Sequence, residues 1–182
     1  MKRNLTASIF AGLTFFLLCS IALGSSKDYK VIRAVDGDTV VVAHHGKQEK
    51  VRLLCIDTPE SVHPDKKQNI PMGKVASDFT SKRLLGKSVD LEFGPELRDR
   101  YGRLLAYVLV EGKNFNLEVV RQGLSPYYTK YGLSRKYDQD FREAEKLARK
   151  DKLNIWRDPE LTERYMRLKS KWGQEQSKVS HR

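Results

Sequence analysis

The chain has 182 residues with 34 Lys+Arg against 23 Asp+Glu, a balance that favours a polyanionic partner such as nucleic acid or an anionic membrane surface. Its two cysteines are Cys19 and Cys55, and its four scattered histidines lack a Cys-x-x-Cys companion, which argues against a zinc site. The length suits one domain with a single core, but neither length nor charge specifies a fold.

Residues 1–24 are predicted to be a signal peptide. A basic pair at positions 2 and 3 precedes an almost wholly apolar run at 9–23, which ends in a small-x-small cleavage site at Gly24. Cleavage there removes two basic residues and no acids, so the mature charge falls from +11 to +9. It also leaves Cys55 without a disulfide partner and makes the protein secreted or periplasmic. A retained membrane anchor is the alternative, although the run is short for a span of about 20 residues.

Five short strands are predicted after this segment. Valine-rich or alternating apolar segments place them at 30–35, 39–43, 48–56, 89–93 and 104–110. Asp36-Gly37 is a strong hairpin signal, so the first three strands should form an antiparallel meander. A polar segment at 94–102 is expected to be the turn between the last two strands.

Four helices are predicted, at 73–85, 116–122 and 137–150, with a last one that opens at Asp158-Pro159. The last helix carries an apolar stripe that needs burial, formed by Leu161, Tyr165, Leu168 and Trp172. After Gly173 the chain is polar and is expected to fray. The segment 61–72 has two prolines and no periodicity, which is typical of a mobile surface loop.

This order of elements does not suit a parallel sheet. It favours a mixed α+β fold: a closed barrel of five antiparallel strands, the oligonucleotide-binding (OB) fold, with three packed helices. Closure of the barrel removes exposed strand edges. We predict this domain over 25–156, followed by a basic C-terminal helical extension at 157–182. The extension either covers the barrel or extends the nucleic-acid surface, and its apolar stripe favours the first.

The third strand ends in a conflict between burial and charge. The run VRLLCIDTPE places Arg52 in an apolar strand and two carboxylates, Asp57 and Glu60, directly after it. Such conflicts are expected mainly at functional sites. The alternative is structural: Arg52 pairs with Asp57, and Thr58 caps a helix that starts at Pro59.

A second acid can reach the same rim of the barrel. Asp38 lies just past the first hairpin turn and Asp57 ends the third strand, so the meander can bring both to one edge. With the backbone carbonyl of Thr58 they form an all-oxygen site that suits calcium or magnesium. Alternatively, Asp38 is a turn residue selected only for its conformation.

Two arginines can complete a phosphate site beside these acids. Arg103 begins the fifth strand, and its guanidinium and that of Arg52 can hold one phosphate from two sides. Glu60 can then orient or deprotonate an attacking water. The alternative for Arg103 is a solvated charge at the end of a hairpin.

Tyrosines interleaved with cations follow the second predicted helix. The group consists of Tyr127, Tyr128, Lys130, Tyr131, Arg135 and Lys136. This composition is typical of a groove that stacks single-stranded nucleic acid. Alternatively, at least one of these tyrosines belongs to the core.

Five segments resemble one known family. VDGDTV, VRLLCIDTPE, DRYGRLLAY, VRQGL and KLNIW occur in this order between residues 30 and 156, and together they resemble the staphylococcal nuclease (thermonuclease) family. The resemblance implies an OB barrel with three helices. It also implies calcium-dependent cleavage of DNA and RNA, in which water attacks phosphorus and 3′-phosphate ends remain.

The resemblance implies roles for the residues around the acids. Asp38 and Asp57 match carboxylate ligands of calcium, and Thr58 matches a carbonyl ligand. Asp36 matches an acid near the metal whose contact is indirect. The catalytic residues implied are the two phosphate-binding arginines and the general base, namely Arg52, Arg103 and Glu60.

The substrate-binding positions are less complete in the resemblance. Arg100 stands where the prototype of the family has lysine, and Tyr101 follows it. We also expect Tyr128 and Tyr131 to contact substrate, although the loop 125–131 does not align cleanly with the family.

The sequence therefore favours an exported, calcium-dependent nuclease with little sequence preference, acting as a monomer without a stable protein partner. The alternative is an OB-fold module that binds nucleic acid without cutting it, against which the complete set of site residues argues. A third interpretation, a basic membrane-surface protein, depends on charge and the N-terminal segment alone.

Overall fold

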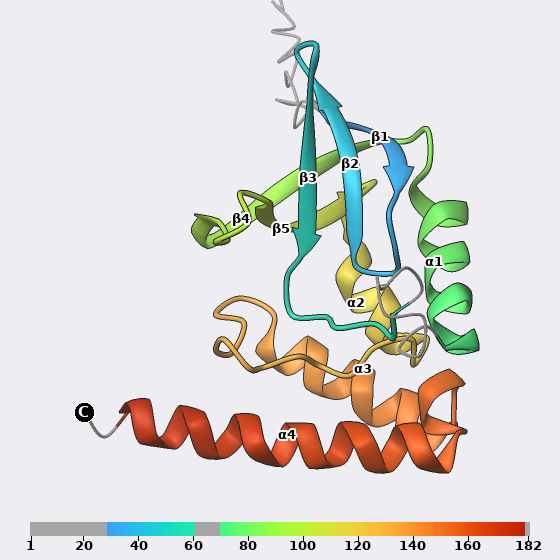
Figure 1. Cartoon of the computed structure of the whole chain (residues 1–182), viewed down its shortest axis with the longest axis vertical. Helices are drawn as coiled ribbons and strands as arrows, with labels where there is room; N and C mark the ends of the chain where they lie inside the picture. The colour runs from blue at the N-terminus through green and yellow to red at the C-terminus, as the bar shows by residue number, and fades with distance from the viewer. Residues whose placement is uncertain (1–28, 61–69, 181–182) are drawn as a thin grey trace, which may run out of the picture.

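The computed structural model describes residues 29–60 and 70–180. The predicted signal peptide and residues 61–69 of the predicted loop lie outside these ranges. The strands are β1 Tyr29–Ala34, β2 Thr39–His44, β3 Lys47–Leu53, β4 Ser88–Arg98, β5 Leu104–Val110 and β6 Lys113–Asn114. The helices are α1 Pro71–Leu84, α2 Phe115–Arg121, α3 Asp138–Lys150 and α4 Pro159–Ser180, with a short 3-10 turn at Asn154–Trp156 (Figure 1).

Strands β1 to β5 form the predicted closed barrel. Neighbouring strands follow the order β3-β2-β1-β4-β5, and β3 pairs with β5 to close the ring. The meander of β1, β2 and β3 is antiparallel, as predicted. The closing pair, however, is parallel, with Val51 opposite Leu104. The expectation of an antiparallel barrel was wrong at this pair because strand directions cannot alternate all the way around a ring of five.

The alternation of side chains along β3 separates the core from the site. Val51 and Leu53 are buried inside the barrel, in a cluster with Val31, Val40 and Val42. Because successive side chains of a strand point to opposite faces, Arg52 lies on the outer face. There it is opposite Leu105 of β5.

Two strands differ from the prediction. β4 continues to Arg98, so the predicted turn at 94–102 is partly strand, with a register irregularity between Phe93 and Arg98. The two-residue strand β6 was not predicted. Its Asn114 also caps α2, because the side-chain oxygen accepts hydrogen bonds from the backbone N–H groups of Asn116 and Leu117.

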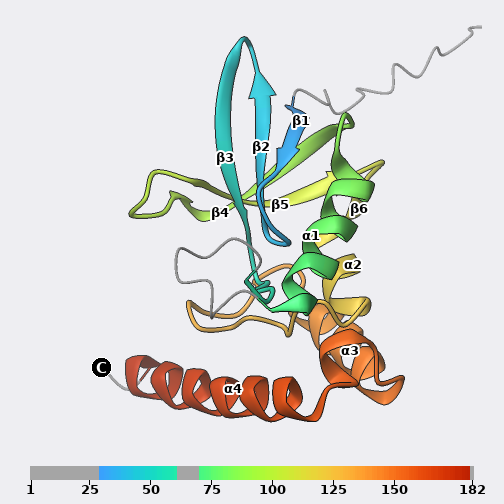
Figure 2. The ribbon, with the colours of Figure 1, turned by 45° about the vertical axis from the view of Figure 1, so that its right-hand side comes forward.

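The last helix confirms its predicted start and its apolar stripe. Asp158 Oδ1 accepts hydrogen bonds from the N–H groups of Glu160 and Leu161, at 2.9 and 3.1 Å, ahead of which Pro159 occupies the first helical position. Tyr165 and Trp172 are buried. Figures 1 and 2 show α4 lying along the end of the molecule opposite the β2–β3 hairpin, with α3 between it and the barrel.

The predicted fraying after Gly173 was wrong, because α4 continues to Ser180. One glycine costs a helix only about 1 kcal/mol, which the burial of Trp172 offsets. In the part of the chain that the structure describes, no helix is long and apolar enough to cross a membrane. The domain boundaries at residues 24 and 156 remain predictions.

Candidate active site

Arg52 shapes the loop that follows its own strand. Its Nη1 donates hydrogen bonds of 2.8 Å to the carbonyl oxygens of both Leu53 and Ile56. Cys55, between them, has a φ of 62°, a left-handed conformation that is uncommon for a residue with a side chain. The guanidinium therefore holds a tight bend, and this bend turns Asp57 back toward Arg52.

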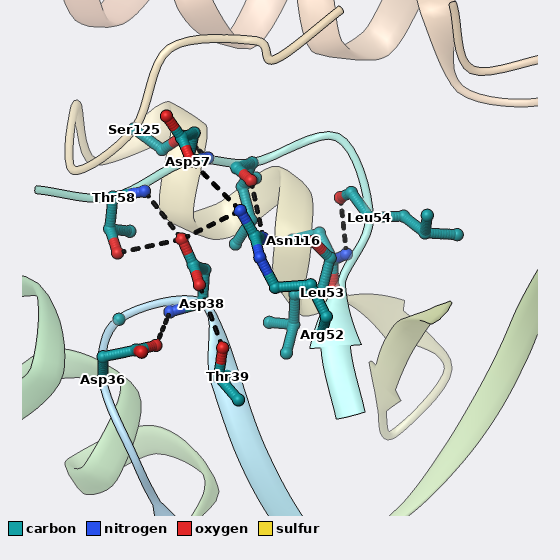
Figure 3. Close-up of polar contacts among 12 residues, drawn as sticks. Asp36, Asp38, Thr39, Arg52, Leu53, Leu54, Asp57, Thr58, Asn116 and Ser125 are labelled. Atoms are coloured by element: carbon teal, nitrogen blue, oxygen red, sulfur yellow. Dashed lines mark hydrogen bonds and ion pairs between the residues drawn. The ribbon is translucent and has the colours of Figure 1, made fainter. Parts of the chain in front are cut away.

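Two carboxylates share one nitrogen of Arg52. Nη2 lies 3.3 Å from Asp38 Oδ2 and 3.1 Å from Asp57 Oδ1 (Figure 3). Asp38 Oδ2 also accepts hydrogen bonds from the backbone N–H and the hydroxyl of Thr58, at 2.9 and 3.2 Å. Thr39 donates to Asp38 Oδ1 at 3.1 Å. The hairpin turn and the end of β3 thus meet at one rim of the barrel, as the sequence predicted.

The site carries more negative charge than Arg52 neutralises. Asp36 Oδ1 accepts a 3.0 Å hydrogen bond from the N–H of Asp38, which brings a third acid close. Burial and then the charge of Asp38 raise the pKa of Asp36 to about 7 and that of Asp57 to about 6. Burial opposes ionisation of Arg52, but Asp38 and Asp57 outweigh it and raise the pKa of the guanidinium. A cation bound at this rim would reduce the repulsion among these three carboxylates.

The alternative interpretation of Arg52 and Thr58 as purely structural residues is partly confirmed. Arg52 does pair with Asp57, but Thr58 and Pro59 do not start a helix. The first helix begins at Pro71, beyond the residues 61–69 that the structure does not describe. The acids are therefore on a loop at the barrel rim rather than on a helix cap.

Three residues that the sequence analysis did not assign to the site hold this loop in place. Ser125 Oγ accepts a 2.7 Å hydrogen bond from the N–H of Asp57, and Tyr165 on α4 donates a long one, 3.5 Å, to the Asp57 carbonyl. Asn116 on α2 is fully buried and donates to the Leu54 carbonyl at 2.8 Å. A polar Asn in an apolar helix face was the one available signal, since an amide is buried only where its hydrogen bonds are made.

Glu60 stands beside the acids and is exposed. Its carbonyl accepts a 3.2 Å hydrogen bond from the N–H of Ile70. The start of α1 lies so close that a Cβ at Gly73 would be 2.1 Å from the Glu60 carbonyl oxygen, which explains the glycine. Burial and the charge of Asp38 raise the pKa of Asp57 most, Arg52 lowers it, and the charge of Glu60 adds a smaller upward effect. The carboxylate is thus near the rim and open to solvent.

Arg103 forms an ion pair with Asp99, a residue of the same turn. Its Nε and Nη2 each lie 2.7 Å from Asp99 Oδ2. Burial acts in the opposite direction, but the hydrogen bonds from Arg103 lower the pKa of Asp99. Among the described residues no ion pair joins Arg103 to Asp38 or Asp57. Arg103 immediately precedes β5, and continuing the parallel register by one residue puts it on the same face as Arg52, displaced by about 7 Å along the strand direction.

The predicted substrate-binding residues surround this face. Arg100 donates a 2.6 Å hydrogen bond to the hydroxyl of Tyr101, whose ring also lies 4.8 Å from the Arg100 guanidinium. Tyr101 and Tyr131 are 69% and 84% exposed, and cationic groups lie beside both rings: Arg103 at 5.6 Å from Tyr101 and Lys130 at 5.5 Å from Tyr131. Tyr131 touches Tyr128 edge to face at 5.9 Å.

Tyr128 links this aromatic surface to the acids. Burial first, and the charge of Asp57 second, raise the pKa of the Tyr128 hydroxyl. Its ring lies 4.7 Å from that of Trp172 on α4. Tyr127, in contrast, is fully buried, which confirms that one tyrosine of the group belongs to the core.

The donor set fits a hard divalent cation. Two carboxylates converge on one point, and calcium accepts such oxygens together with carbonyls and water. No group of three or more His, Cys, Asp or Glu side chains placed to hold a metal occurs within 29–60 and 70–180. The metal interpretation therefore depends on Asp38, Asp57 and a backbone carbonyl such as that of Thr58.

Comparison with known proteins identifies the family to which the chain belongs. Residues 50–158, more than half of the chain, match the family model described as staphylococcal nuclease homologue. The chain belongs to the staphylococcal nuclease family. The resemblance inferred from the five segments is confirmed. The match includes Arg52, Asp57, Glu60 and Arg103 and ends just before α4 begins at Pro159.

Named members of the staphylococcal nuclease family are similar over most of the chain. The thermonuclease of Staphylococcus hyicus is 40% identical over 141 residues, covering 78% of this chain and 82% of the relative. The thermonuclease of Staphylococcus intermedius is 42% identical over 130 residues, covering 71% and 76%. Endonuclease YncB of Bacillus subtilis (strain 168) is 41% identical over 125 residues, covering 68% and 59%.

Proposed function

We propose that this protein is an exported, monomeric, calcium-dependent nuclease that hydrolyses phosphodiester bonds of DNA and RNA and leaves 3′-phosphate ends. The observation that carries the proposal is the meeting of Asp38 and Asp57 on one Arg52 nitrogen at the barrel rim. Glu60 and Arg103 lie around this point, and relatives that span most of the chain are named as nucleases.

Asp38, Asp57 and the Thr58 carbonyl would hold the calcium ion. When bound, calcium would neutralise the acids and stabilise negative charge on the phosphate oxygens. The raised pKa values of Asp36 and Asp57 support this assignment, because they mark a site that lacks positive charge. Magnesium would meet the same ligands but demands a stricter octahedral geometry.

The two arginines would hold the scissile phosphate. Arg52 is fixed by two carbonyls and two carboxylates, so its position is set before substrate arrives. Arg103 uses Nε and Nη2 on Asp99, which leaves Nη1 to donate to a phosphate oxygen. Donors placed in advance stabilise charge that grows in the transition state, and each contributes about 10²–10³ in rate.

Glu60 would be the group that accepts a proton from water. It is exposed and near Asp57, so water can reach it. Positioned general bases contribute about 10²–10⁴-fold to a rate. The exposed rings of Tyr101 and Tyr131 would stack bases, and stacking with phosphate contacts reads little sequence.

A cleavage assay separates this nuclease from the alternative, a barrel that binds nucleic acid without cutting it. Plasmid DNA and a transfer RNA are incubated with calcium, with magnesium or with chelator, and the ends are identified by their response to phosphatase. We expect cleavage of both substrates with calcium alone and 3′-phosphate ends. Retention of intact DNA with equal affinity in all three conditions would support the binding module instead.

The Glu60→Gln variant tests the site. It should lower kcat by about 10²-fold or more while DNA affinity stays nearly unchanged. The matched control is Glu111→Gln, which makes the same charge change on the exposed turn at the far end of β5 from Arg103. Equal activity of the two variants would remove Glu60 from the mechanism.

Export is tested separately. The full chain is produced in a bacterial host, and the mature N-terminus is determined from the protein found outside the cytoplasm. We expect the mature chain to begin at Ser25. An intact N-terminus in the membrane fraction would indicate the retained anchor.

A further inference from the structure

A groove lies between α3 and α4, apart from the candidate active site. Its volume is about 810 Å³, within the range of ligand sites, and its floor includes Trp156. Six cationic residues line it: Arg142, Lys146, Arg149, Lys150, Lys152 and Lys169. Glu145 is the one acidic residue of the lining, so the groove has a strong positive excess.

The cations are arranged as a surface for a chain of anions. Arg142, Lys146, Arg149 and Lys150 follow one face of α3, because side chains three and four positions apart are neighbours on a helix. Figures 1 and 2 show both helices below the barrel, with α3 running obliquely to α4. Four of the six cations in the groove lining thus come from α3 and are spread over about two turns of it, rather than gathered at one point.

Half of these six cations have no ion pair among the described residues. Lys169 is committed, since its Nζ lies 2.8 Å from a Glu145 oxygen and the pair is largely buried. Its bond neutralises the single acid of the lining. Within the described residues, no ion pair involves Arg149, Lys150 or Lys152. Arg142 pairs with Asp138 at 2.9 Å and Lys146 with Glu143 at 3.5 Å, both on the outer surface of α3. Exposed pairs of this kind contribute little and exchange easily.

The groove borders the active site at one end. Tyr127 and Thr129 line it, and Tyr128 between them donates a 2.9 Å backbone hydrogen bond to the carbonyl of Cys55, on the loop that carries Asp57. One wall is α4, which lies beyond the family match at 50–158. The groove thus has one wall, α3, inside the region that matches the family model and another, α4, outside it.

We propose that the groove between α3 and α4 is a second nucleic-acid site, which binds the phosphates of a single strand several nucleotides away from the bond that is cut. The proposal rests on the proposed function for the identity of the ligand. The row of cations fits successive phosphates, and the concave shape suits a strand better than a flat membrane surface. Long substrates would use the groove, and short ones would not reach it.

The test removes two cations that the candidate active site does not use. In the double variant Lys146→Gln/Lys150→Gln both positions are exposed, and glutamine keeps the helix propensity of lysine. The control is Lys30→Gln/Lys47→Gln, which makes the same charge change at exposed positions of β1 and β3 beside the β2–β3 hairpin. Far-ultraviolet circular dichroism confirms that both proteins fold.

Binding is measured in chelator by fluorescence anisotropy, with a 20-nucleotide and a 4-nucleotide oligothymidylate at several salt concentrations. For the long strand, the groove variant should lower the slope of log K against log salt by about 1.4, because each lost phosphate contact removes about 0.7. Affinity at 50 mM salt should fall by about tenfold or more. The short strand and the control variant should change little.

Two results would overturn the proposal. A groove variant that equals the control on the long strand would show that the groove carries no strand. An equal loss on the short strand would assign the two lysines to the active site itself. Because these measurements need no cleavage, they stay distinct from a failure of the proposed activity, which wild-type protein with calcium reveals separately.

Discussion

Arg52 lies on β3 and Arg103 immediately precedes the adjacent strand β5, on the same face of the barrel, but their surroundings differ. The Arg52 side chain is 15% exposed and is held by two carbonyls and two carboxylates. The Arg103 side chain is 28% exposed; its guanidinium pairs with Asp99 and lies 5.6 Å from the centre of the Tyr101 ring. The Arg52 guanidinium is part of the framework of its loop, whereas Arg103 is bound to one carboxylate and one ring of its own turn.

The difference shows that two arginines proposed to bind the same phosphate can contribute differently to the stability of the fold. A buried arginine that neutralises two acids cannot be removed without leaving those acids unpaired, so its catalytic and structural contributions are inseparable. An arginine bound to one carboxylate and one ring on an exposed turn can be removed at small cost to folding. Substitutions at the two positions should therefore separate activity from stability.

Arg52→Gln should have the largest effect. We expect about 10³-fold lower kcat and a loss of about 3 kcal/mol or more in the free energy of unfolding, since Asp38 and Asp57 lose their cation. Urea denaturation with and without calcium measures the second quantity. A stability loss below about 1 kcal/mol would show that Arg52 is not part of the loop framework.

Arg103→Gln should lower kcat by about 10²-fold while the free energy of unfolding changes by about 1 kcal/mol or less. The same denaturation and cleavage assays are used, so the ratio of the two effects can be compared directly with Arg52→Gln. If both variants lost stability equally, the contrast between the two arginines would be wrong.

Asp38→Asn should weaken calcium binding by about tenfold or more, because a neutral amide replaces a charged ligand. Isothermal titration with calcium measures the change. Asp90→Asn on β4 makes the same substitution away from the rim and is the control. Unchanged calcium affinity would remove Asp38 from the metal site.

Asp99→Asn should have the smallest effect, about three- to tenfold on kcat with little change in KM. The amide keeps the shape of the turn but weakens the charge-assisted bond that orients Arg103. In an Arg103→Gln background the same change should have no further effect on kcat, which a double-mutant cycle checks. Additive losses would mean that Asp99 acts independently of Arg103.

The barrel and the meeting of the acids could be predicted from the sequence because local signals define them. Asp36-Gly37 marks a hairpin, and the hairpin fixes the register that brings Asp38 beside the end of β3. The parallel β3–β5 pair was missed since it joins distant segments, although a ring of five strands requires one such pair. The length of β4 was missed because Gly94 and Pro95 suggest a turn, and the strand passes them at an irregular step in its register.

The supports of the site could not be predicted. Ser125 and Tyr165 reach Asp57 from a loop and a late helix, and nothing in their neighbours along the chain indicates which backbone group they will bind. Tyr165 was recognised only as an apolar stripe position. Its hydroxyl reaches the Asp57 carbonyl only because α4 packs beside the rim, and this tertiary packing cannot be inferred from local sequence.

The parallel pairing of β3 with β5 also bears on when activity can arise. Arg52 lies on one side of this seam and Arg103 on the other, so the two guanidiniums come together only once the ring has shut. A chain that is still unfolded, as during transport out of a cell, would hold every chemical group of the site and yet cut nothing. On the proposed function and the proposed export, a chain that stays unfolded until it has left the producing cell would be inactive toward the nucleic acids of that cell.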